Sequence, residues 1–175
     1  SGELLALADQ VRSGDPGNVE AQAARLYWSR TLGRGVGRQP AAGQLIGANA
    51  CLDYGYAVLR GHLMRAVLAA GLAPALGVFH RGRGNAFALA DDLIEPFRPA
   101  IDEVALPLPA TASPSDREVK QLLVAAASQR FDVDGHGIPA VAEALAQSFG
   151  RYIEGDIDRL QVASWQGPSR VGVGD

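Results

Sequence analysis

Residues 45–71 read LIGANACLDYGYAVLRGHLMRAVLAAG and form the longest helical pattern in the chain. Apolar side chains recur along it at the three-to-four-residue spacing of an α-helix, and they are numerous enough for a helix that packs near the centre of the protein. Gly71 follows the pattern at a position where glycine commonly ends a helix. We therefore predict a central core helix from about Leu45 to Ala70.

Shorter helical patterns lie on both sides of this segment. They are predicted at 3–12, at about 16–29 with Asp15 as cap, Pro16 in the first turn and Glu20 in the first turns, at 86–94 after a capping Asn85, at 98–105, at 116–129 and at 138–160. The connections are a glycine-rich loop at 33–43, a proline- and serine-rich linker at 107–115, and a small strand or turn at 130–134. The sequence thus predicts an all-α fold, with one compact helical domain over 1–166 and a flexible tail over 167–175.

The composition is that of a folded globular protein. Of the 175 residues, 47% are hydrophobic and 20% are charged. The apolar stretch 56–76 contains Arg60, His62 and Arg65, so it offers no uninterrupted membrane span. The single cysteine, Cys51, excludes an internal disulfide and a multi-cysteine zinc site, fits a reducing cytoplasm, and is predicted to lie in the core.

The charge is unevenly distributed along the chain. The net charge of −3 does not by itself indicate a nucleic-acid-binding protein. Residues 1–100, however, have a net charge of +2, and residues 101–175 a net charge of −5. A divalent metal ion bound by acidic side chains of the first part would leave the arginines around it facing an anionic ligand. We therefore expect any binding surface within the first hundred residues.

A histidine and nearby carboxylates could form a metal site. Asp92 and Glu95 are three residues apart and project from one face of the predicted helix 86–94, and Asp91 precedes them. His80 precedes a tight glycine-containing turn that can direct it back toward this helix. One imidazole with carboxylate oxygens suits Mg²⁺ or Mn²⁺, which support phosphodiester chemistry.

Each of these residues also has a simpler explanation. The three carboxylates could simply form a solvated helix face. His80 could be a hydrogen-bonded structural histidine, and Glu20 could be a surface carboxylate. The same reasoning makes His62 structural, and it makes His136 a solvent-facing side chain with no partner nearby in sequence. Spacing alone does not decide between the two interpretations.

Arginine supplies fifteen of the sixteen Lys and Arg residues. Its planar guanidinium binds phosphate through paired hydrogen bonds, which lysine cannot form, although a GC-rich coding bias would also favour arginine. Arg81 and Arg83 directly follow His80 and could hold a phosphate beside a metal ion. Arg34 and Arg38 lie in the glycine-rich loop, where basic side chains often contact phosphates.

The segment 48–100 resembles the C-terminal domain of the CRISPR-associated protein one family, the integrases of spacer acquisition. The resemblance rests on N-x-x-L-x-Y-G-Y from Asn49, A-G-L-x-P-x-L-G from Ala70, the histidine that follows, and A-D-D-L-I-E-P-F-R-P ending at Pro99. Upstream, GDPGNVEAQAARLYW over 14–28 resembles the segment that contains the family's first metal ligand. The residues of these motifs are most similar to those of the family members that accompany type II systems.

The resemblance implies a function for particular residues. Glu20, His80 and Glu95 match the family's divalent-metal triad, for Mg²⁺ or Mn²⁺. Asp92 matches an acidic position that supports the metal or the attacking hydroxyl. The arginines assigned to DNA contact are Arg34, Arg38, Arg81, Arg83 and Arg98.

The resemblance also implies a reaction and partners. The 3′-hydroxyl of a double-stranded prespacer attacks a phosphodiester at the leader–repeat junction of a CRISPR array, without a covalent enzyme intermediate. Members of the family act as homodimers, and two dimers flank a small ferredoxin-like partner subunit. The resemblance also implies that the family's N-terminal β-rich domain would end before the first residue of this sequence.

Two alternatives stay open at this point. A metal-dependent endonuclease acting on branched DNA would use the same residues, with water in place of the 3′-hydroxyl. A non-catalytic DNA-binding or assembly module would keep the fold without the reaction. The intact set of Glu20, His80 and Glu95 argues against a degraded site.

Overall fold

The computed structural model describes residues 2–12, 14–32, 38–40, 43–80, 84–165 and 167. Its packing divides the chain into two compact units, residues 1–44 and residues 45–175. All the buried hydrophobic side chains of the described residues lie in the second unit, from Ala50 onward. The hydrophobic core is therefore a property of residues 45–175.

The first unit consists of α1 (Gly2–Ala8) and α2 (Val19–Thr31), which pack against each other. An ion pair between Arg30 and Glu3 joins them. The carboxylate of Asp15 accepts the backbone N–H groups of Val19 and Glu20 at 2.8 and 3.0 Å. The Asp15 side chain thus satisfies the first N–H groups of α2, but the N-cap residue is Asn18. The prediction that Asp15 is the cap residue and Pro16 lies in the first turn is therefore wrong, because residues 15–18 form a turn before the helix begins.

The central helix of the second unit is α3 (Gly47–Ala69). Leu52, Leu59 and Leu63 along it are fully buried, as is Cys51, which confirms the predicted core helix and the core position of the cysteine. Gly71 has a φ of +73° and directs the chain away from the helix. The N–H of Leu72 then bonds to the carbonyl of Val67 at 3.1 Å, which is the hydrogen bond of a Schellman motif.

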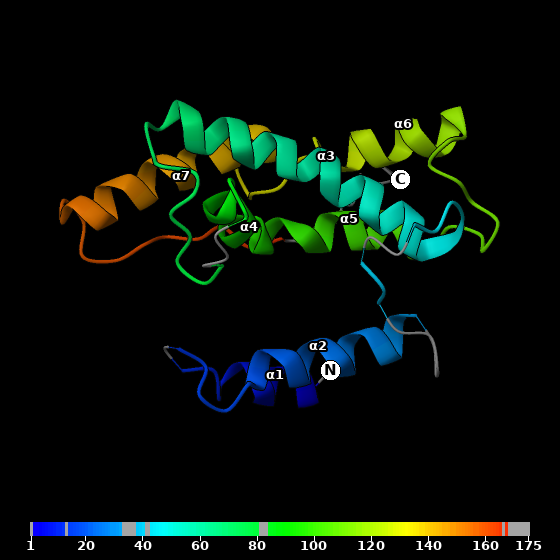
Figure 1. The fold of residues 1–175 in the computed structure, drawn as a ribbon, viewed down its shortest axis with the longest axis horizontal. Helices are drawn as coiled ribbons and strands as arrows, with labels where there is room; N and C mark the ends of the chain where they lie inside the picture. The colour runs from blue at the N-terminus through cyan, green and yellow to red at the C-terminus, as the bar shows by residue number, and fades with distance from the viewer. Residues whose placement is uncertain are drawn as a thin grey trace, which may run out of the picture. The chain divides into compact units, whose positions relative to one another are not determined.

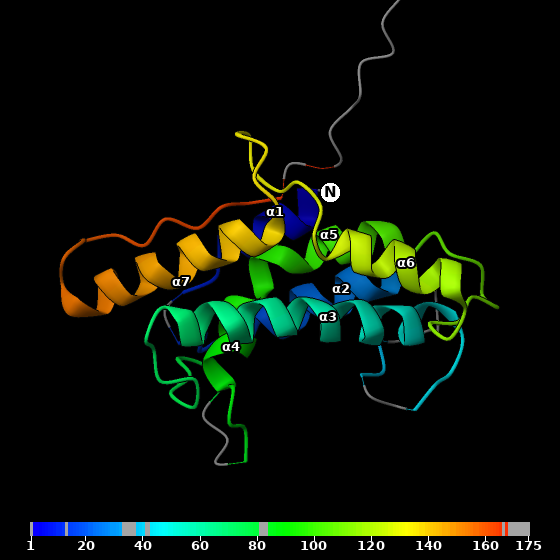
Figure 2. The same cartoon turned by 90° about the horizontal axis from the view of Figure 1, so that it is seen from above.

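Shorter helices pack around α3. They are α4 (Ala88–Leu93), the 3₁₀-helix η1 (Glu95–Phe97), α5 (Arg98–Ala105), α6 (Arg117–Ala126) and α7 (Ile138–Glu154). The helices α4, α5, α6 and α7 all contact α3, and Figures 1 and 2 show α3 running beside α7 and α6. The helix α4, which lies between His80 and Glu95 in the sequence, is therefore packed directly against the central helix.

Two predicted helix ends are wrong. The helix expected at 138–160 stops at Glu154, because Gly155 has a φ of +82° and reverses the chain. The helix expected at 3–12 already ends at Ala8.

The all-α class is confirmed. Among the described residues the only β-structure is an isolated bridge between Arg130 and Gly137, in the segment predicted to be a small strand or a turn. No helix within the described ranges is long and apolar enough to cross a membrane.

Candidate metal centre

The short helix α4 holds two consecutive carboxylates in different surroundings. Its apolar residues Ala88, Leu89 and Leu93 are buried and attach it to the core. Asp92 faces the loop that ends at His80, whereas Asp91 faces α3. The two neighbouring side chains therefore have different roles.

The carboxylate of Asp92 holds both the backbone and the ring of His80. Its Oδ2 accepts the backbone N–H groups of Val78 and Phe79, and its Oδ1 accepts that of His80 at 3.1 Å. The same Oδ1 lies 2.7 Å from Nδ1 of the His80 ring. Since the side chain of Asp92 is only 8% exposed, these contacts define its surroundings.

These hydrogen bonds determine which nitrogen of His80 is available. Burial of Asp92 acts to raise the pKa of its carboxyl, but the hydrogen bonds from the His80 ring and from three backbone N–H groups lower that pKa below its ordinary value. An ionised carboxylate only accepts hydrogen bonds, so Nδ1 of His80 is the protonated nitrogen. In the neutral imidazole, Nε2 is then the nitrogen with the lone pair that can bind a metal ion, on a side chain that is 53% exposed.

Gly77 allows the loop to fold closely around Asp92. A Cβ atom at this position would lie 2.3 Å from the carbonyl oxygen of His80, 2.8 Å from Cβ of Ala88 and 2.9 Å from Oδ2 of Asp92. All three distances are shorter than a normal contact, and two of the three atoms belong to backbone or to a buried residue. Any larger residue would displace either the His80 segment or α4.

Asp91 attaches α4 to the central helix. Arg60 of α3 binds both of its carboxylate oxygens, with Nη2 at 3.0 Å from Oδ2. The side-chain amide of Asn85 donates to Oδ2 at 2.7 Å, and Nη2 of Arg60 donates to Oδ1 of Asn85 at 3.3 Å. Burial of Asp91 acts to raise the pKa of its carboxyl, and the hydrogen bonds from Arg60 and Asn85 lower that pKa overall.

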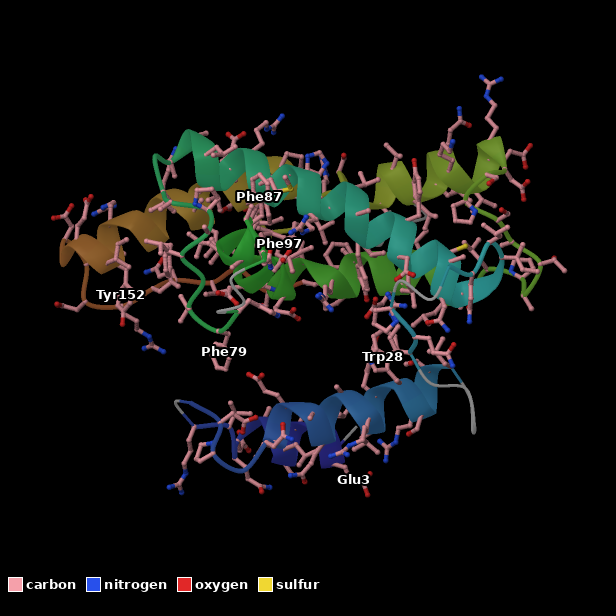
Figure 3. All side chains as sticks on the ribbon, viewed as in Figure 1. Glu3, Trp28, Phe79, Phe87, Phe97 and Tyr152 are labelled. Carbon is pink, nitrogen blue, oxygen red and sulfur yellow. The ribbon has the colours of Figure 1, made fainter. Side chains whose placement is uncertain are left out.

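Glu95 lies on η1, directly after α4. Its carboxylate pairs with Nη2 of Arg98 at 3.1 Å, and the guanidinium of Arg98 lies 4.9 Å from the centre of the Tyr56 ring. The side chain of Glu95 is 56% exposed, so its carboxylate is accessible to a ligand. Figure 3 shows Phe97 at the other end of η1 inside the unit, while Phe79, beside His80, points outward.

Of the remaining predicted residues, Glu20 and Arg38 are described by the structure and the other three are not. Glu20 is exposed in the first turn of α2, and it belongs to the unit 1–44, so its convergence with His80 and Glu95 stays a prediction. The guanidinium of Arg38 lies 5.9 Å from the centre of the Trp28 ring. Arg34, Arg81 and Arg83 lie outside the described residues.

A second group of potential ligands was missed by sequence reasoning. Asp132, Asp134 and His136 have ligand atoms within 4.8 Å of one another, an arrangement that His80, Asp92 and Glu95 do not form. His136 donates its backbone N–H to Asp132 at 2.8 Å, and its Nδ1 lies 2.8 Å from the same carboxylate. The expectation that His136 lacks a nearby partner is therefore wrong. The four-residue spacing of Asp132 and His136 was the available signal.

The pair Asp132–His136 resembles the pair Asp92–His80 in its contacts but differs in its surroundings. It lies beside a cavity of about 540 Å³ that is lined by apolar residues such as Phe97, Val141 and Leu145. None of the predicted metal ligands lines this cavity. The hydrogen bond to Asp132 raises the pKa of His136 above its ordinary value.

Comparison with known proteins identifies similar sequences. The family described as "CRISPR associated protein Cas1" matches residues 17–118. The CRISPR-associated endonuclease Cas1 of Neisseria meningitidis serogroup C is 50% identical over 99 residues, which cover 57% of this chain and 31% of that protein. A second CRISPR-associated endonuclease, Cas1 2 of Pyrobaculum aerophilum, is 28% identical over 154 residues, covering 85% of this chain and 52% of its own length. The chain thus spans about a third to a half of these relatives.

Solved structures with a similar fold include a casposase. A casposase bound to its integration product superposes with a TM-score of 0.72 over 91% of this chain and 53% of the casposase chain. Its sequence identity is 18%, so the likeness concerns the fold. The matched part extends beyond the segment that contains His80 and Glu95.

Proposed function

Since residues 17–118 match the family, this chain belongs to the Cas1 family of CRISPR-associated proteins, and we propose that it forms the catalytic part of a divalent-metal-dependent DNA integrase. Its substrates are a double-stranded prespacer and the leader–repeat junction of a CRISPR array. The observation that supports this most directly is the contact between Asp92 and His80, because it presents Nε2 of the histidine for metal binding. That contact lies within the segment that matches the family.

The donor atoms fit a hard divalent cation. His80 offers an imidazole nitrogen, and Glu95 offers an exposed carboxylate on the next element. Glu20 completes the proposed set, and one nitrogen with several oxygens suits Mg²⁺ or Mn²⁺. Such an ion, when bound, polarises a phosphoryl oxygen and lowers the pKa of a bound hydroxyl. Asp92 orients the His80 ring rather than binding the ion.

The proposed reaction exchanges one phosphodiester for another. The 3′-hydroxyl oxygen of the prespacer forms a bond to the phosphorus at the edge of the repeat. The bond between that phosphorus and the 3′-oxygen of the adjoining leader nucleotide breaks, and the proton lost by the attacking hydroxyl balances the one gained by the leaving oxygen. No covalent bond to the protein forms, so the side chains only need to hold and orient the two DNA ends.

Two described arginines are placed to contribute to DNA binding. Arg98 lies three residues after Glu95 and forms an ion pair with it, so it is close to the proposed metal ligand. Arg38 stands over Trp28 in the unit that contains Glu20. We also assign Arg34, Arg81 and Arg83 to phosphate contact. A homodimer and a small ferredoxin-like partner subunit, as in type II-like systems, complete the proposed assembly.

Hydrolysis of DNA is the second candidate activity. It is favoured by the name of the Neisseria meningitidis relative, which is called an endonuclease. Integration is favoured by the fold of the casposase, which was solved with an integration product. Both reactions use the same ligands, so only their products separate them.

The test is strand transfer of a labelled prespacer into a leader–repeat plasmid. The full-length protein is assayed with its small partner subunit, in Mn²⁺ or in EDTA. We expect metal-dependent joining that is lost in His80→Ala and Glu95→Ala. His136→Ala is the matched control, because it removes a histidine with the same carboxylate contacts outside the proposed site, and it should join DNA normally.

Each other outcome has a defined meaning. Metal-dependent cleavage without joining would replace integration by hydrolysis. DNA binding without any reaction, unchanged by metal and by the two substitutions, would identify a non-catalytic module. Equal loss of joining in all three variants would show that His80 has no special role.

A further inference from the structure

Arg60 lies on α3, away from the proposed ligands, yet it is connected to them through α4. It binds both oxygens of Asp91, and the adjacent Asp92 binds the ring and backbone of His80. Because Asp91 and Asp92 are consecutive on one helix, a rotation of that helix moves both carboxylates together. The position of His80 is thereby linked to the central helix.

The helix α4 depends on such an attachment. It has six residues, and its N-cap residue, Phe87, forms no side-chain capping hydrogen bond. A helix this short is not stable by itself in water and needs tertiary contacts to fix its position. Its buried apolar side chains, Ala88, Leu89, Ala90 and Leu93, pack the helix against the core, and the hydrogen bonds of Asp91 add a directional contact.

Arg60 supplies directional contacts at the start of α4. Its guanidinium makes two hydrogen bonds to Asp91, one to Asn85 at 3.3 Å, and stacks 5.8 Å from the centre of the Phe87 ring. Asn85 in turn accepts the backbone N–H of Phe87 at 3.1 Å. The planar fork of an arginine constrains both distance and angle, so this network fixes the rotation of α4 about its axis.

We propose that Arg60 is a positioning residue for His80. By binding Asp91, Arg60 fixes the orientation of α4, and this orientation holds Asp92 in contact with His80. The expected effect of Arg60 on catalysis rests on the proposed function. Its effect on the orientation of His80 does not. Arg60 does not touch the substrate or the metal ion in this proposal. Its effect is on how often His80 presents Nε2 in the correct orientation.

The charge state of the pair agrees with a strong contact. The hydrogen bond to Asp91 raises the pKa of Arg60 despite partial burial, and Asp91 has a side chain that is only 22% exposed. A hydrogen-bonded pair in this environment is less screened than a surface ion pair. By contrast, Arg65 on the same helix pairs with Glu143 of α7 at 3.1 Å, with both side chains more exposed.

The test measures the tautomeric state of His80. NMR of the ring nitrogens reports this state in the 175-residue chain labelled with ¹⁵N-histidine. In the unsubstituted chain, at a pH where the imidazole is neutral, the His80 signals should be those of the tautomer with the proton on Nδ1. Arg60→Gln should shift both ring nitrogens toward the tautomeric mixture of an unrestrained histidine. Arg60→Lys, which keeps the charge and loses the fork, should give a smaller shift.

Arg65→Gln is the matched control, because it removes an arginine–carboxylate contact from the same helix without touching α4. If the His80 signals of Arg60→Gln coincide with those of Arg65→Gln, the proposal is wrong. Should Arg60→Gln fail to fold, Asp91→Asn keeps the shape of the side chain, removes its charge and must produce the same shift.

Strand transfer by the full-length protein provides a second measurement. We expect Arg60→Gln to lower kcat by about tenfold or more, the usual effect of removing an outer support of a metal ligand, with KM for DNA unchanged. A rise in KM with unchanged kcat would make Arg60 a DNA contact and overturn the proposal. If the unsubstituted protein joins no DNA while the His80 shift still appears, the proposed function fails and the positioning role of Arg60 stands.

Discussion

Gly77 is the residue on which the geometry around His80 depends most closely. We expect Gly77→Ala to destabilise the protein by about 1–3 kcal/mol, because the new Cβ would overlap the His80 carbonyl, Ala88 and Asp92. Urea unfolding followed by circular dichroism measures this change. Gly84→Ala is the matched control, since a Cβ there meets nothing within 4 Å.

The His80 signals should respond to the same substitution. Gly77→Ala must either move the His80 segment or displace α4, and both changes weaken the contact between Asp92 and His80. An alanine variant with unchanged stability and an unchanged His80 tautomer would show that the loop relaxes without cost. The close fit of Gly77 would then not be required.

The sequence indicates that the candidate residues lie near one another, but it does not predict their contacts. Asp92 and Glu95 were placed on one helix face and His80 nearby, from spacing and resemblance. The hydrogen bonds that three consecutive backbone N–H groups donate to the Asp92 carboxylate do not follow from the sequence, because they join residues twelve to fourteen positions apart. Such contacts depend on how a loop folds over a helix, which a local pattern does not specify.

At the scale of elements, α3 and α5 approach closely at a glycine. A Cβ atom on Gly55 would lie 2.5 Å from Cγ2 of Ile101, which is fully buried on α5. We expect Gly55→Ala to lower the free energy of unfolding by about 1–3 kcal/mol through overpacking. Thermal or urea unfolding measures it.

Gly61 on the same helix provides the opposite case. A Cβ there meets nothing within 4 Å, so Gly61→Ala should stabilise α3 by about 0.5–1 kcal/mol, the difference in helix propensity. Two alanine substitutions in one helix thus have opposite expected signs. If both stabilise the protein, helix propensity outweighs packing at Gly55, and α5 must move away from α3.

Helix interiors were predicted more reliably than helix ends. The core helix was expected at about 45–70 and is observed at 47–69, with the expected glycine after it. The last helix was extended past Gly155 because apolar residues continue beyond it to Leu160. A hydrophobic period does not distinguish a helix from an extended segment that packs against it. The positive φ of Gly155 decided the end.

The extended segment after α7 is attached to the core by its far end. The ring of Trp165 packs against Phe131 with 5.6 Å between ring centres, and its Nε1 donates to Glu103 at 2.9 Å. The residues between Gly155 and Trp165 therefore belong to the second unit although they are not helical. The predicted domain end at 166 lies directly after this contact.

At the scale of the whole molecule, the all-α class followed from the sequence, whereas the division into units at 44 and 45 did not. Composition does not reveal it, because α1 and α2 have apolar patterns of their own. The difference is that neither helix has a buried residue, while α3 alone has nine. The stability of the chain should therefore come almost entirely from residues 45–175.

This distribution of the core makes opposite predictions for two truncations. Removing residues 1–44 should change the melting temperature by only a few degrees, since no buried side chain is lost from the described residues. Removing residues 156–175 deletes far fewer residues, but it uncovers Phe131 and leaves Glu103 without its Trp165 contact. We expect this shorter deletion to lower the melting temperature by about 6 °C or more, the effect of roughly 2 kcal/mol in a chain of this size.

Differential scanning calorimetry of the two truncated chains beside the 175-residue chain measures both effects. Trp165→Ala is the control for the second deletion, because it removes the ring alone and should account for most of the loss. A larger destabilisation on removing residues 1–44 than on removing residues 156–175 would contradict the assignment of the core to the second unit. It would mean that α1 and α2 stabilise residues 45–175 in solution, and that the two units unfold as one.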